Sequence, residues 1–546
     1  MSEASTLTEM FDQAVARFGP RPCLEFLGAH WTYTETAQLV ARARAGLQAM
    51  GVKPGDRVGL CLPNTPDAVI GYYAILGLGA VVVNFSPLSP PVDLANQARD
   101  AGVGVMITIN LTPILDNVLT ILRKDAIKAV VVCDFTAALP PPKRWGFRLL
   151  KRKLLSQSPT SDARVQRWER VIASSPMPSA RVSPDDLAVL QYTGGTTGTP
   201  KGVMLTHANL TANATQLRAW MPDSVPGAER ELVVLPLFHV FAMTVAMNVP
   251  LGWGAELVLL PKFDIDMLRE ALKRRRPTIV PGVPTLFKAM LDKGLTNVDL
   301  ASVKVCISGG APLPHEVQRA FEAAAGCDLV EGYGLTEASP VCFCNPIGRS
   351  GRDGTIGIPL SRIEAQIHDL ADPSIIMPHG ERGELWVRGP NVMRGYWNNP
   401  EATAEALTPD GWLRTGDVGI MDADGYVELV DRIKDLILCS GFNVYPRRIE
   451  EALYLHPDVT AAIAVGEPDE YRGESVAAFV QIAPGARVTT SELLEFLRDK
   501  LTSIEMPRRL EFRQELPRTA VGKLSRKELR SELLPPRSFP QAIGKT

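Results

Sequence analysis

An uncharged stretch of 18 residues, from Ala68 to Phe85 (AVIGYYAILGLGAVVVNF), is the feature that most constrains the fold. Its length approaches that of a transmembrane helix. Three glycines interrupt it, however, and a β-branched run lies near its end, so a buried helix, a glycine turn and a buried strand explain it better. Residues 240–260 repeat this layout. Because strands that are apolar on both faces are typical of parallel sheets covered by helices, we predict an α/β fold and no membrane span.

The pattern changes twice along the chain. Helical and strand patterns alternate to about residue 340, which favours a large N-terminal domain of parallel-rich sheets with helices. From about 345 to 430, short strands lie between Gly, Pro and Asp turns, as in a small β unit. After Asp431 an α+β pattern follows, with helices expected at 446–456, 490–501 and 525–533.

Charge and cysteine content exclude several classes of protein. Lys and Arg number 58 against 60 Asp and Glu, a net charge of −2, so there is no electrostatic case for nucleic acid as a partner. The eight cysteines form no C-x-x-C pair, which argues against a disulfide framework or a zinc site. The first residues, MSEASTLTEMFDQ, lack the layout of a signal peptide. We therefore expect a cytoplasmic location.

Residues 143–153 form a basic segment with six Lys or Arg and no acidic side chain, interleaved with Trp145, Phe147, Leu149 and Leu150. Such a segment is either a solvated surface insertion or a basic amphipathic element that touches anionic lipid. The second interpretation predicts peripheral contact with the inner face of the membrane. Both interpretations stay open at this point.

Residues 192–202 (YTGGTTGTPKG) form the strongest local motif, between a predicted strand and a helix that starts near Thr206. Glycines let backbone N–H groups converge, threonines add hydroxyl donors and a lysine adds positive charge, as in a polyphosphate nest. The flanking Pro200 and Gly202 exclude a Walker A loop. The candidate phosphate-binding residues are Thr193, Gly194, Gly195, Thr196, Thr197, Gly198, Thr199 and Lys201.

Six further motifs follow in order: LPLFH at 235–239, SGGAPL at 308–313, EGYGLTE at 331–337, GWLRTGD at 411–417, VDRIKDLILCSGFNVYP at 430–446 and PRTAVGKLSR at 517–526. With the phosphate loop, they make nearly the whole chain resemble the adenylate-forming superfamily, and within it the acyl-CoA synthetases. The forms YTGGTTG and DLILCSGFNVYP look most like bacterial long-chain fatty acid–CoA ligases. The resemblance implies ATP, Mg²⁺ and coenzyme A as cofactors. It also implies a large AMP-binding domain at 1–430, a hinge at 431–434, a small mobile C-terminal domain at 435–535 and a tail at 536–546.

The resemblance also implies roles for individual residues. Thr336 and Glu337 would lie at the α-phosphate, with Glu337 and Thr196 as oxygen ligands of Mg²⁺. Lys523 would bridge the substrate carboxylate and the α-phosphate, and Lys434 would be the hinge residue. The adenine would be bordered by Gly310, Ala311, Pro312, Gly332, Tyr333 and Gly334, the ribose held by Asp417 and Arg432, and coenzyme A contacted by Gly441, Phe442, Asn443 and Lys262. Lys262 is equally well a surface lysine after a strand. Without the motif series, Asp417 would be a turn aspartate.

The acid substrate is indicated by His239, which stands where amino-acid-activating relatives carry an aspartate for the substrate ammonium. The expected acyl pocket is apolar, with no fixed charge for a second carboxylate. It is lined by Phe241, Val245, Ile307, Pro340 and Val341 and by the glycines Gly310, Gly332 and Gly334. Such a slot stabilises an alkyl chain by roughly 0.8 kcal/mol per buried methylene. We therefore expect a medium- to long-chain fatty acid.

Three other functions stay open from the sequence. They are an aryl-acid CoA ligase of the 4-coumarate type, an acyl-AMP ligase that loads a carrier protein, and a nucleotide-binding or lipid-binding protein without catalysis. Intact Lys201, Glu337 and Lys523 argue against the last. The chain length preference, the pathway and a homodimeric state are not fixed by the residues.

Overall fold

The computed structural model describes residues 4–158, 161–193, 200–348, 351–352, 354–440, 442–519 and 523–533. The chain divides into two compact units. Unit 1 comprises Met1–Ala365 and Trp386–Arg414, and unit 2 comprises Gln366–Leu385 and Thr415–Thr546. The division assigns residues 415–430 to unit 2, whereas the sequence places its boundary at residue 431. The hinge at 431–434 stays a prediction.

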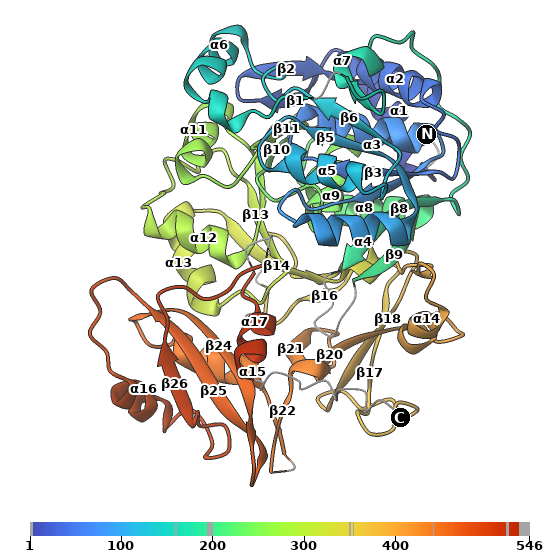
Figure 1. The fold of residues 1–546 in the computed structure, drawn as a ribbon. Helices are drawn as coiled ribbons and strands as arrows, with labels where there is room; N and C mark the ends of the chain where they lie inside the picture. The colour runs from blue at the N-terminus through green and yellow to red at the C-terminus, as the bar shows by residue number, and fades with distance from the viewer. Residues whose placement is uncertain are drawn as a thin grey trace, which may run out of the picture. The chain divides into compact units, whose positions relative to one another are not determined.

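Unit 1 contains two large, mostly parallel sheets with helices packed on them (Figure 1). The nine-stranded sheet has the order β16 (Ile358–Pro359), β15 (Val341–Cys344), β14 (Asp328–Gly334), β13 (Val305–Gly309), β12 (Ile279–Gly282), β10 (Arg230–Val233), β11 (Glu256–Leu259), β1 (Pro22–Phe26) and β2 (Ala29–Thr32). The eight-stranded sheet has the order β19 (Gly395–Tyr396), β9 (Lys201–Thr206), β8 (Leu187–Thr193), β4 (Val81–Asn84), β3 (Arg57–Cys61), β5 (Val103–Ile109), β6 (Ala129–Cys133) and β7 (Val165–Arg167). This confirms the predicted α/β architecture.

The helices of unit 1 connect and cover these strands. They are α1 (Leu7–Phe18), α2 (Tyr33–Ala49), α3 (Pro66–Gly77), α4 (Pro91–Ala101), α5 (Ile114–Arg123), α6 (Pro141–Leu150), α7 (Trp168–Val171), α8 (His207–Trp220), α9 (Val240–Met243), α10 (Val249–Gly252), α11 (Ile265–Arg275), α12 (Pro284–Asp292), α13 (His315–Ala325) and α14 (Pro400–Ala406). Short turns of other helix types are η1 (Arg152–Leu154), the π-helix η2 (Thr244–Asn248) and η3 (Thr336–Ala338).

The uncharged stretch folds as predicted. It forms α3, whose residues are almost all buried, then a turn in which Gly79 has a φ of 72°, then the buried strand β4. Residues 240–260 likewise form α9, η2 and α10 before β11. Within the part of the chain that the structure describes, no helix is long and apolar enough to cross a membrane. The apolar character therefore reflects burial on both faces of a sheet.

The short strands at 364–432 form a four-stranded sheet in the order β17 (Glu364–His368), β18 (Arg382–Arg388), β20 (Leu413–Met421) and β21 (Val427–Arg432). The chain passes between the two units within three of these strands.

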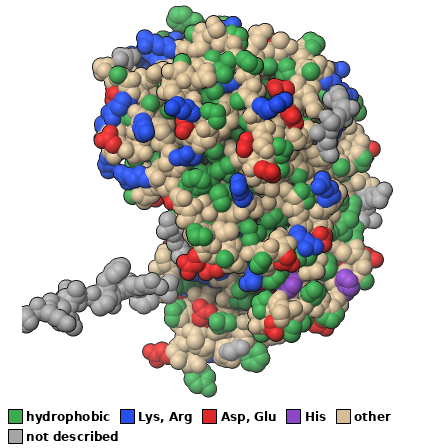
Figure 2. All heavy atoms as spheres, turned by 90° about the vertical axis from the view of Figure 1, so that its right-hand side faces the viewer, with side chains coloured by type: hydrophobic (Ala, Val, Ile, Leu, Met, Phe, Trp, Pro, Cys, Tyr) green, Lys and Arg blue, Asp and Glu red, His purple; other side chains and the backbone are tan. Residues whose placement is uncertain are grey.

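Unit 2 also contains a largely antiparallel sheet of β22 (Ile437–Cys439), β23 (Phe442–Val444), β24 (Val459–Asp469), β25 (Gly473–Ile482) and β26 (Arg509–Phe512). It carries the helices η4 (Ile433–Asp435), α15 (Pro446–Tyr454), α16 (Thr490–Leu497) and α17 (Arg526–Leu533), close to the predicted positions. On the face drawn in Figure 2, basic and acidic side chains are interspersed, as the near-zero net charge leads one to expect.

Candidate active site

The predicted phosphate loop connects two antiparallel strands. β8 and β9 pair from Leu187↔Thr206 to Thr193↔Lys201, so the loop closes a hairpin. The helix expected near Thr206 is α8, which begins directly after β9 with Thr206 as its N-cap. Lys201 therefore belongs to a strand, and the loop does not run straight into a helix. The predicted loop residues Gly194, Gly195, Thr196, Thr197, Gly198 and Thr199 lie outside the described residues.

The lysine after this loop lies beside a tyrosine that holds a predicted catalytic carboxylate. The Nζ of Lys201 lies 5.0 Å from the ring centroid of Tyr396. The hydroxyl of Tyr396 donates a hydrogen bond of 2.8 Å to Oε1 of Glu337. Burial and the charge of Glu337 raise the pKa of Tyr396, which keeps the hydroxyl protonated as a donor. Three elements, β9, β19 and η3, thus bring a cation, a phenol and a carboxylate together.

Tyr396 is a candidate functional residue that sequence reasoning missed. Strand β19 pairs with β9 through Gly395↔Met204 and Tyr396↔Val203, and the N–H of Met393 donates to the carbonyl of Glu337 over 2.7 Å. These contacts join segments far apart in sequence. The only local signal is the RGYW sequence at 394–397, which has no spacing that marks a phosphate site.

The predicted adenine-bordering residues meet at one edge of the nine-stranded sheet. β13 and β14 are parallel neighbours, paired up to Gly309↔Gly332. Gly310, Ala311 and Pro312 follow the end of β13, whereas Gly332, Tyr333 and Gly334 form the end of β14. Ligands of open α/β sheets bind outside the carboxyl ends of the strands. The structure brings these residues together at such an edge, with Thr336 and Glu337 in the next turn.

Close approach of a neighbouring residue explains two of the glycines. A Cβ on Gly334 would lie 1.8 Å from the carbonyl oxygen of Pro340, so no side chain fits there. At Gly309 a Cβ would lie 2.7 Å from the ring of Phe241. At Gly332, by contrast, a Cβ would meet nothing closer than Ile307 Cγ2 at 3.7 Å, so this position has room for a small side chain.

The predicted acyl-pocket residues are buried, and contacts link the elements that carry them. The ring of Phe241 lies against Gly309 at the end of β13, and the Thr244 hydroxyl, next to Val245, donates to the Ser339 carbonyl over 2.8 Å. Buried at this edge are Phe241, Val245, Ile307, Pro340 and Val341. His239 caps α9: its Nδ1 accepts from the N–H of Phe241 at 3.3 Å.

A second group of predicted residues comes together within unit 2. Asp417 on β20 and Arg432 on β21 are cross-strand partners, and Nε of Arg432 lies 3.1 Å from Oδ1 of the buried Asp417. A carboxylate beside a guanidinium at the same strand position fits the prediction that both contact one sugar. Asp417 is more than a turn aspartate, because its side chain is buried in an ion pair.

Lys523 lies near this pair. It is half-buried, and its N–H donates to the hydroxyl of Thr519 over 3.2 Å in a turn closed by the pairing of Arg518 with Leu524. Burial, together with the positive charge of Arg432, lowers the pKa of Lys523 to about 8. A lysine that titrates near physiological pH is unusual for a solvated surface position and is a mark of functional sites.

The predicted hinge residue lies in η4. The carbonyl of Lys434 accepts a 3.2 Å hydrogen bond from Arg530, whose guanidinium is also 3.0 Å from the buried Asp435. Arg526 pairs with Asp435 and with Glu450, at 3.5 and 2.6 Å. Helix α17, which follows the loop of Lys523, is thereby held to the turn that contains Lys434.

The predicted coenzyme A residues are not brought together by any described contact. Phe442 and Asn443 are exposed on β23, and Gly441 lies outside the described residues. Lys262 is exposed in unit 1, in the turn between β11 and α11.

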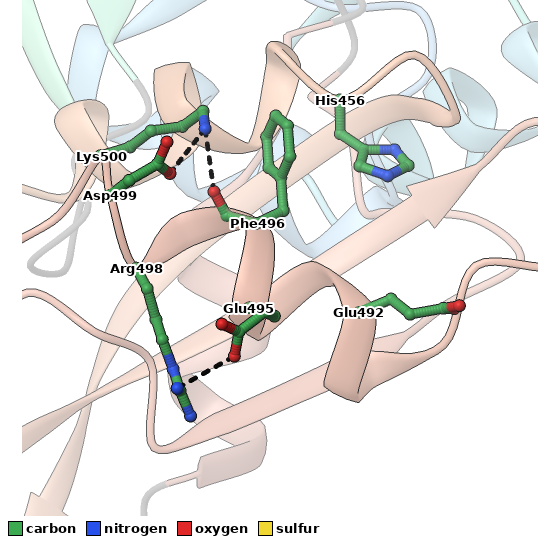
Figure 3. A pocket seen from close by; sticks show the side chains of 7 residues that line it. All are labelled: His456, Glu492, Glu495, Phe496, Arg498, Asp499 and Lys500. Atoms are coloured by element: carbon green, nitrogen blue, oxygen red, sulfur yellow. Dashed lines mark hydrogen bonds and ion pairs between the residues drawn. The ribbon is translucent and has the colours of Figure 1, made fainter.

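A surface hollow of about 520 Å³ lies on α16 in unit 2 (Figure 3). Its lining charges pair with one another, Arg498 with Glu495 and Lys500 with Asp499. It contains none of the predicted site residues.

Comparison with known proteins agrees with this geometry. The family described as AMP-binding enzyme matches residues 11–397, and its C-terminal domain matches residues 448–523. The chain is 42% identical to a long-chain-fatty-acid–CoA ligase of Bacillus subtilis, over 96% of this chain and 94% of the relative. It is 37% identical to a feruloyl-CoA synthase of Amycolatopsis, over 92% and 94%. ATP-bound MatB from Rhodopseudomonas palustris has a TM-score of 0.84 at 28% identity, covering 96% of this chain and 99% of that one.

Proposed function

The chain belongs to the AMP-binding enzyme family, and from that premise we propose that it is an AMP-forming acid–thiol ligase for medium- to long-chain fatty acids. In the first half-reaction a carboxylate oxygen attacks the α-phosphorus of ATP and pyrophosphate leaves. In the second, the thiol sulfur of coenzyme A attacks the acyl carbon and AMP leaves with the carboxylate oxygen. The products are acyl-CoA, AMP and pyrophosphate.

The observation that carries this proposal is the convergence of Lys201, Tyr396 and Glu337 beside the carboxyl ends of β13 and β14. Phosphoryl chemistry requires positioning and charge neutralisation more than covalent help from the protein. Lys201, on the β8–β9 hairpin that carries the phosphate loop, supplies positive charge. The apolar residues at the sheet edge, among them Phe241 and Ile307, receive an alkyl chain. The relative from Bacillus subtilis supports a long-chain acid as substrate.

In this mechanism Lys523 holds the carboxylate and the α-phosphate together, which reduces the repulsion between two anions. It must be protonated to do so. Asp417 and Arg432 hold the ribose, and Lys434 is the hinge about which the small C-terminal domain at 435–535 reorients between the half-reactions. Phe442 and Asn443 would contact the pantetheine arm and Lys262 the nucleotide of coenzyme A. All of these roles are inferred from the sequence motifs in which the residues occur.

Mg²⁺ fits the oxygen donors of the proposed site. Magnesium is usually held by one or two carboxylates together with substrate phosphates and water, without a dedicated protein cage. Glu337 supplies one carboxylate, and its hydrogen bond from Tyr396 fixes the orientation of that group. No cluster of three His, Cys, Asp or Glu suited to a metal occurs among the residues that the structure describes. When bound, the ion neutralises phosphate charge.

An aryl-acid CoA ligase is the second candidate function, because the feruloyl-CoA synthase of Amycolatopsis is nearly as similar over most of the chain. Loading of a carrier protein is a third possibility that the sequence leaves open. A homodimer and a cytoplasmic location stay predictions from the sequence.

The test is acid-dependent pyrophosphate release, measured for saturated acids from acetate to octadecanoate and for 4-coumarate, with and without coenzyme A. The proposal predicts that release and acyl-CoA formation rise with chain length. A preference for 4-coumarate would replace the fatty acid by an aryl acid. Pyrophosphate release without acyl-CoA formation would favour a carrier protein, and no release with any acid would contradict the proposal.

A further inference from the structure

Helix α6 and the turn η1, residues 141–154, project from the edge of unit 1 beside β2 (Figure 1). No side chain of α6 or η1 is fully buried. A contact at its N-terminus ties α6 to the β1–β2 turn, where Nζ of Lys143 donates to the carbonyl of Leu27 over 2.9 Å. The element is therefore ordered by contacts along one side and open along the other.

The side of α6 that faces the rest of unit 1 is partly basic. Arg144 donates to the carbonyls of Thr136 and Ala137 at 3.0 and 2.7 Å. Arg148 pairs with Asp134 at 2.8 Å, and the ring of Phe147 packs on Phe135 at 5.0 Å. Three of the six cations of the basic segment, Lys143, Arg144 and Arg148, thus anchor the helix to the protein.

The outward side of the helix is apolar. Trp145, Leu149 and Leu150 are 75, 82 and 83% exposed. Trp145 and Leu149 are four residues apart and share one face of the helix. A surface helix of a soluble domain ordinarily turns such a face to the core, so this arrangement is inverted. Large apolar side chains grouped on a protruding helix mark an interaction surface.

Cations flank this apolar face. Lys151, Arg152 and Lys153 follow it directly and are exposed, and none of the three forms an ion pair with a residue that the structure describes. Nζ of Lys151 lies 5.8 Å from the ring centroid of Phe147. No Asp or Glu occurs in the sequence between Asp134 and Asp162. The surface therefore combines exposed aromatic and aliphatic groups with uncompensated positive charge.

We propose that the outward face of α6 and η1 docks on a membrane that contains anionic phospholipid. Tryptophan and leucine insert at the boundary of headgroups and acyl chains, while flanking lysine and arginine bind the negatively charged surface. Charge complementarity favours this partner over a second copy of the chain, because a symmetric dimer through α6 would bring identical cations together. The proposal does not depend on which acid the enzyme activates.

Flotation with vesicles tests this surface. The full-length protein is mixed with vesicles of phosphatidylcholine alone or with 30% phosphatidylglycerol, and the bound fraction is measured at low and high salt. The wild-type protein should bind the anionic vesicles, and salt should weaken the binding. Arg152→Gln with Lys153→Gln should lower the partition coefficient by about fivefold per charge. Trp145→Ser with Leu149→Ser should lower it by about tenfold or more.

Matched controls separate this surface from general effects. Lys124→Gln with Lys128→Gln removes two charges elsewhere on the surface of unit 1, and Val298→Ser removes an exposed apolar side chain there. All variants change exposed groups, so melting temperatures should match the wild type. Binding should be retained in the controls.

The proposal is overturned if the wild-type protein does not bind anionic vesicles, or if the control variants lose as much binding as the α6 variants. It is also overturned if sedimentation shows a wild-type dimer that Trp145→Ser with Leu149→Ser converts to a monomer, because α6 would then be a protein interface. Activity on a water-soluble, medium-chain acid should be unchanged throughout, so failure here is distinguishable from failure of the proposed reaction.

Discussion

The hydrogen bond from Tyr396 to Glu337 gives the most specific prediction about the phosphate site. Tyr396→Phe removes the hydroxyl that donates to Oε1 of Glu337 over 2.8 Å and keeps the ring that lies 5.0 Å from Nζ of Lys201. The change therefore isolates one hydrogen bond to a carboxylate. If Glu337 holds Mg²⁺ and the phosphates, its side chain loses the group that fixes its orientation.

The size of the effect follows from the type of bond. A hydrogen bond to a charged group contributes about 1.5–3 kcal/mol, and about 1.4 kcal/mol corresponds to a tenfold change in rate. We expect kcat/KM for ATP to fall by about 10- to 100-fold in Tyr396→Phe, with a higher Mg²⁺ concentration needed for half-maximal rate.

Pyrophosphate release with hexadecanoate, measured at several Mg²⁺ concentrations, gives both quantities. The double variant with Glu337→Gln should be no slower than Glu337→Gln alone, because Tyr396 acts through that carboxylate. Tyr33→Phe is the matched control: it removes a buried hydroxyl of α2 that donates to the Ala255 carbonyl over 2.7 Å. This contact lies next to β11 of the nine-stranded sheet, whereas β8 and β9 belong to the eight-stranded sheet. A loss below about twofold in Tyr396→Phe, or an equal loss in Tyr33→Phe, would refute this reasoning.

Three further predictions address other residues. Lys523→Ala should abolish adenylate formation from the acid and spare thioester formation from supplied acyl-adenylate; equal loss of both steps would contradict its role. Because the pKa of Lys523 is lowered to about 8 and the protonated form is required, the rate of adenylate formation should fall as the pH rises through about 8. Lys523→Arg, whose guanidinium stays protonated, should remove that fall in rate. An unchanged fall in this variant would mean that another group titrates. Gly334→Ala should destabilise and inactivate the enzyme, since its Cβ would lie 1.8 Å from the Pro340 oxygen. Gly332→Ala, which has room for a methyl group, should fold normally and shift the preferred acid to a shorter chain. Chain-length profiles and melting temperatures of both variants test this, and an unshifted profile would remove Gly332 from the pocket. Burial raises the pKa of Asp67 to about 7, so the folded protein keeps a proton that the unfolded chain releases above about pH 4, and stability is lost as the pH rises from about 4 to 7. Asp67→Asn should therefore raise the melting temperature at pH 8 and leave it unchanged near pH 3. A gain of equal size at both pH values would contradict this assignment.

Much of the fold is readable from local patterns. The glycine-punctuated stretch at 68–85 predicts α3 and β4 because burial on both faces leaves no place for a charge. Thr206 predicts the start of α8 because its hydroxyl accepts from the N–H of Asn209. The adenine-bordering motifs follow parallel strands, so their meeting at one sheet edge could be expected.

Contacts between distant segments could not be predicted in the same way. The pairing of β19 with β9 places Tyr396 beside Lys201, and nothing local to either strand indicates that partner. The pattern predicts no strand between the phosphate loop and the helix that starts near Thr206, but β9 lies there and pairs with β8. The orientation of α6 could not be predicted either, since the sequence does not indicate that Arg144 and Arg148 contact the rest of unit 1.

The central claim, attack of a carboxylate on the α-phosphorus of ATP, is tested most directly with hexadecanoate labelled with ¹⁸O in its carboxyl group. After a complete turnover with ATP and coenzyme A, mass spectrometry of the nucleotide should find one ¹⁸O in AMP and none in pyrophosphate. Label in inorganic phosphate, with ADP as the nucleotide product, would instead indicate an acyl phosphate and would contradict the account.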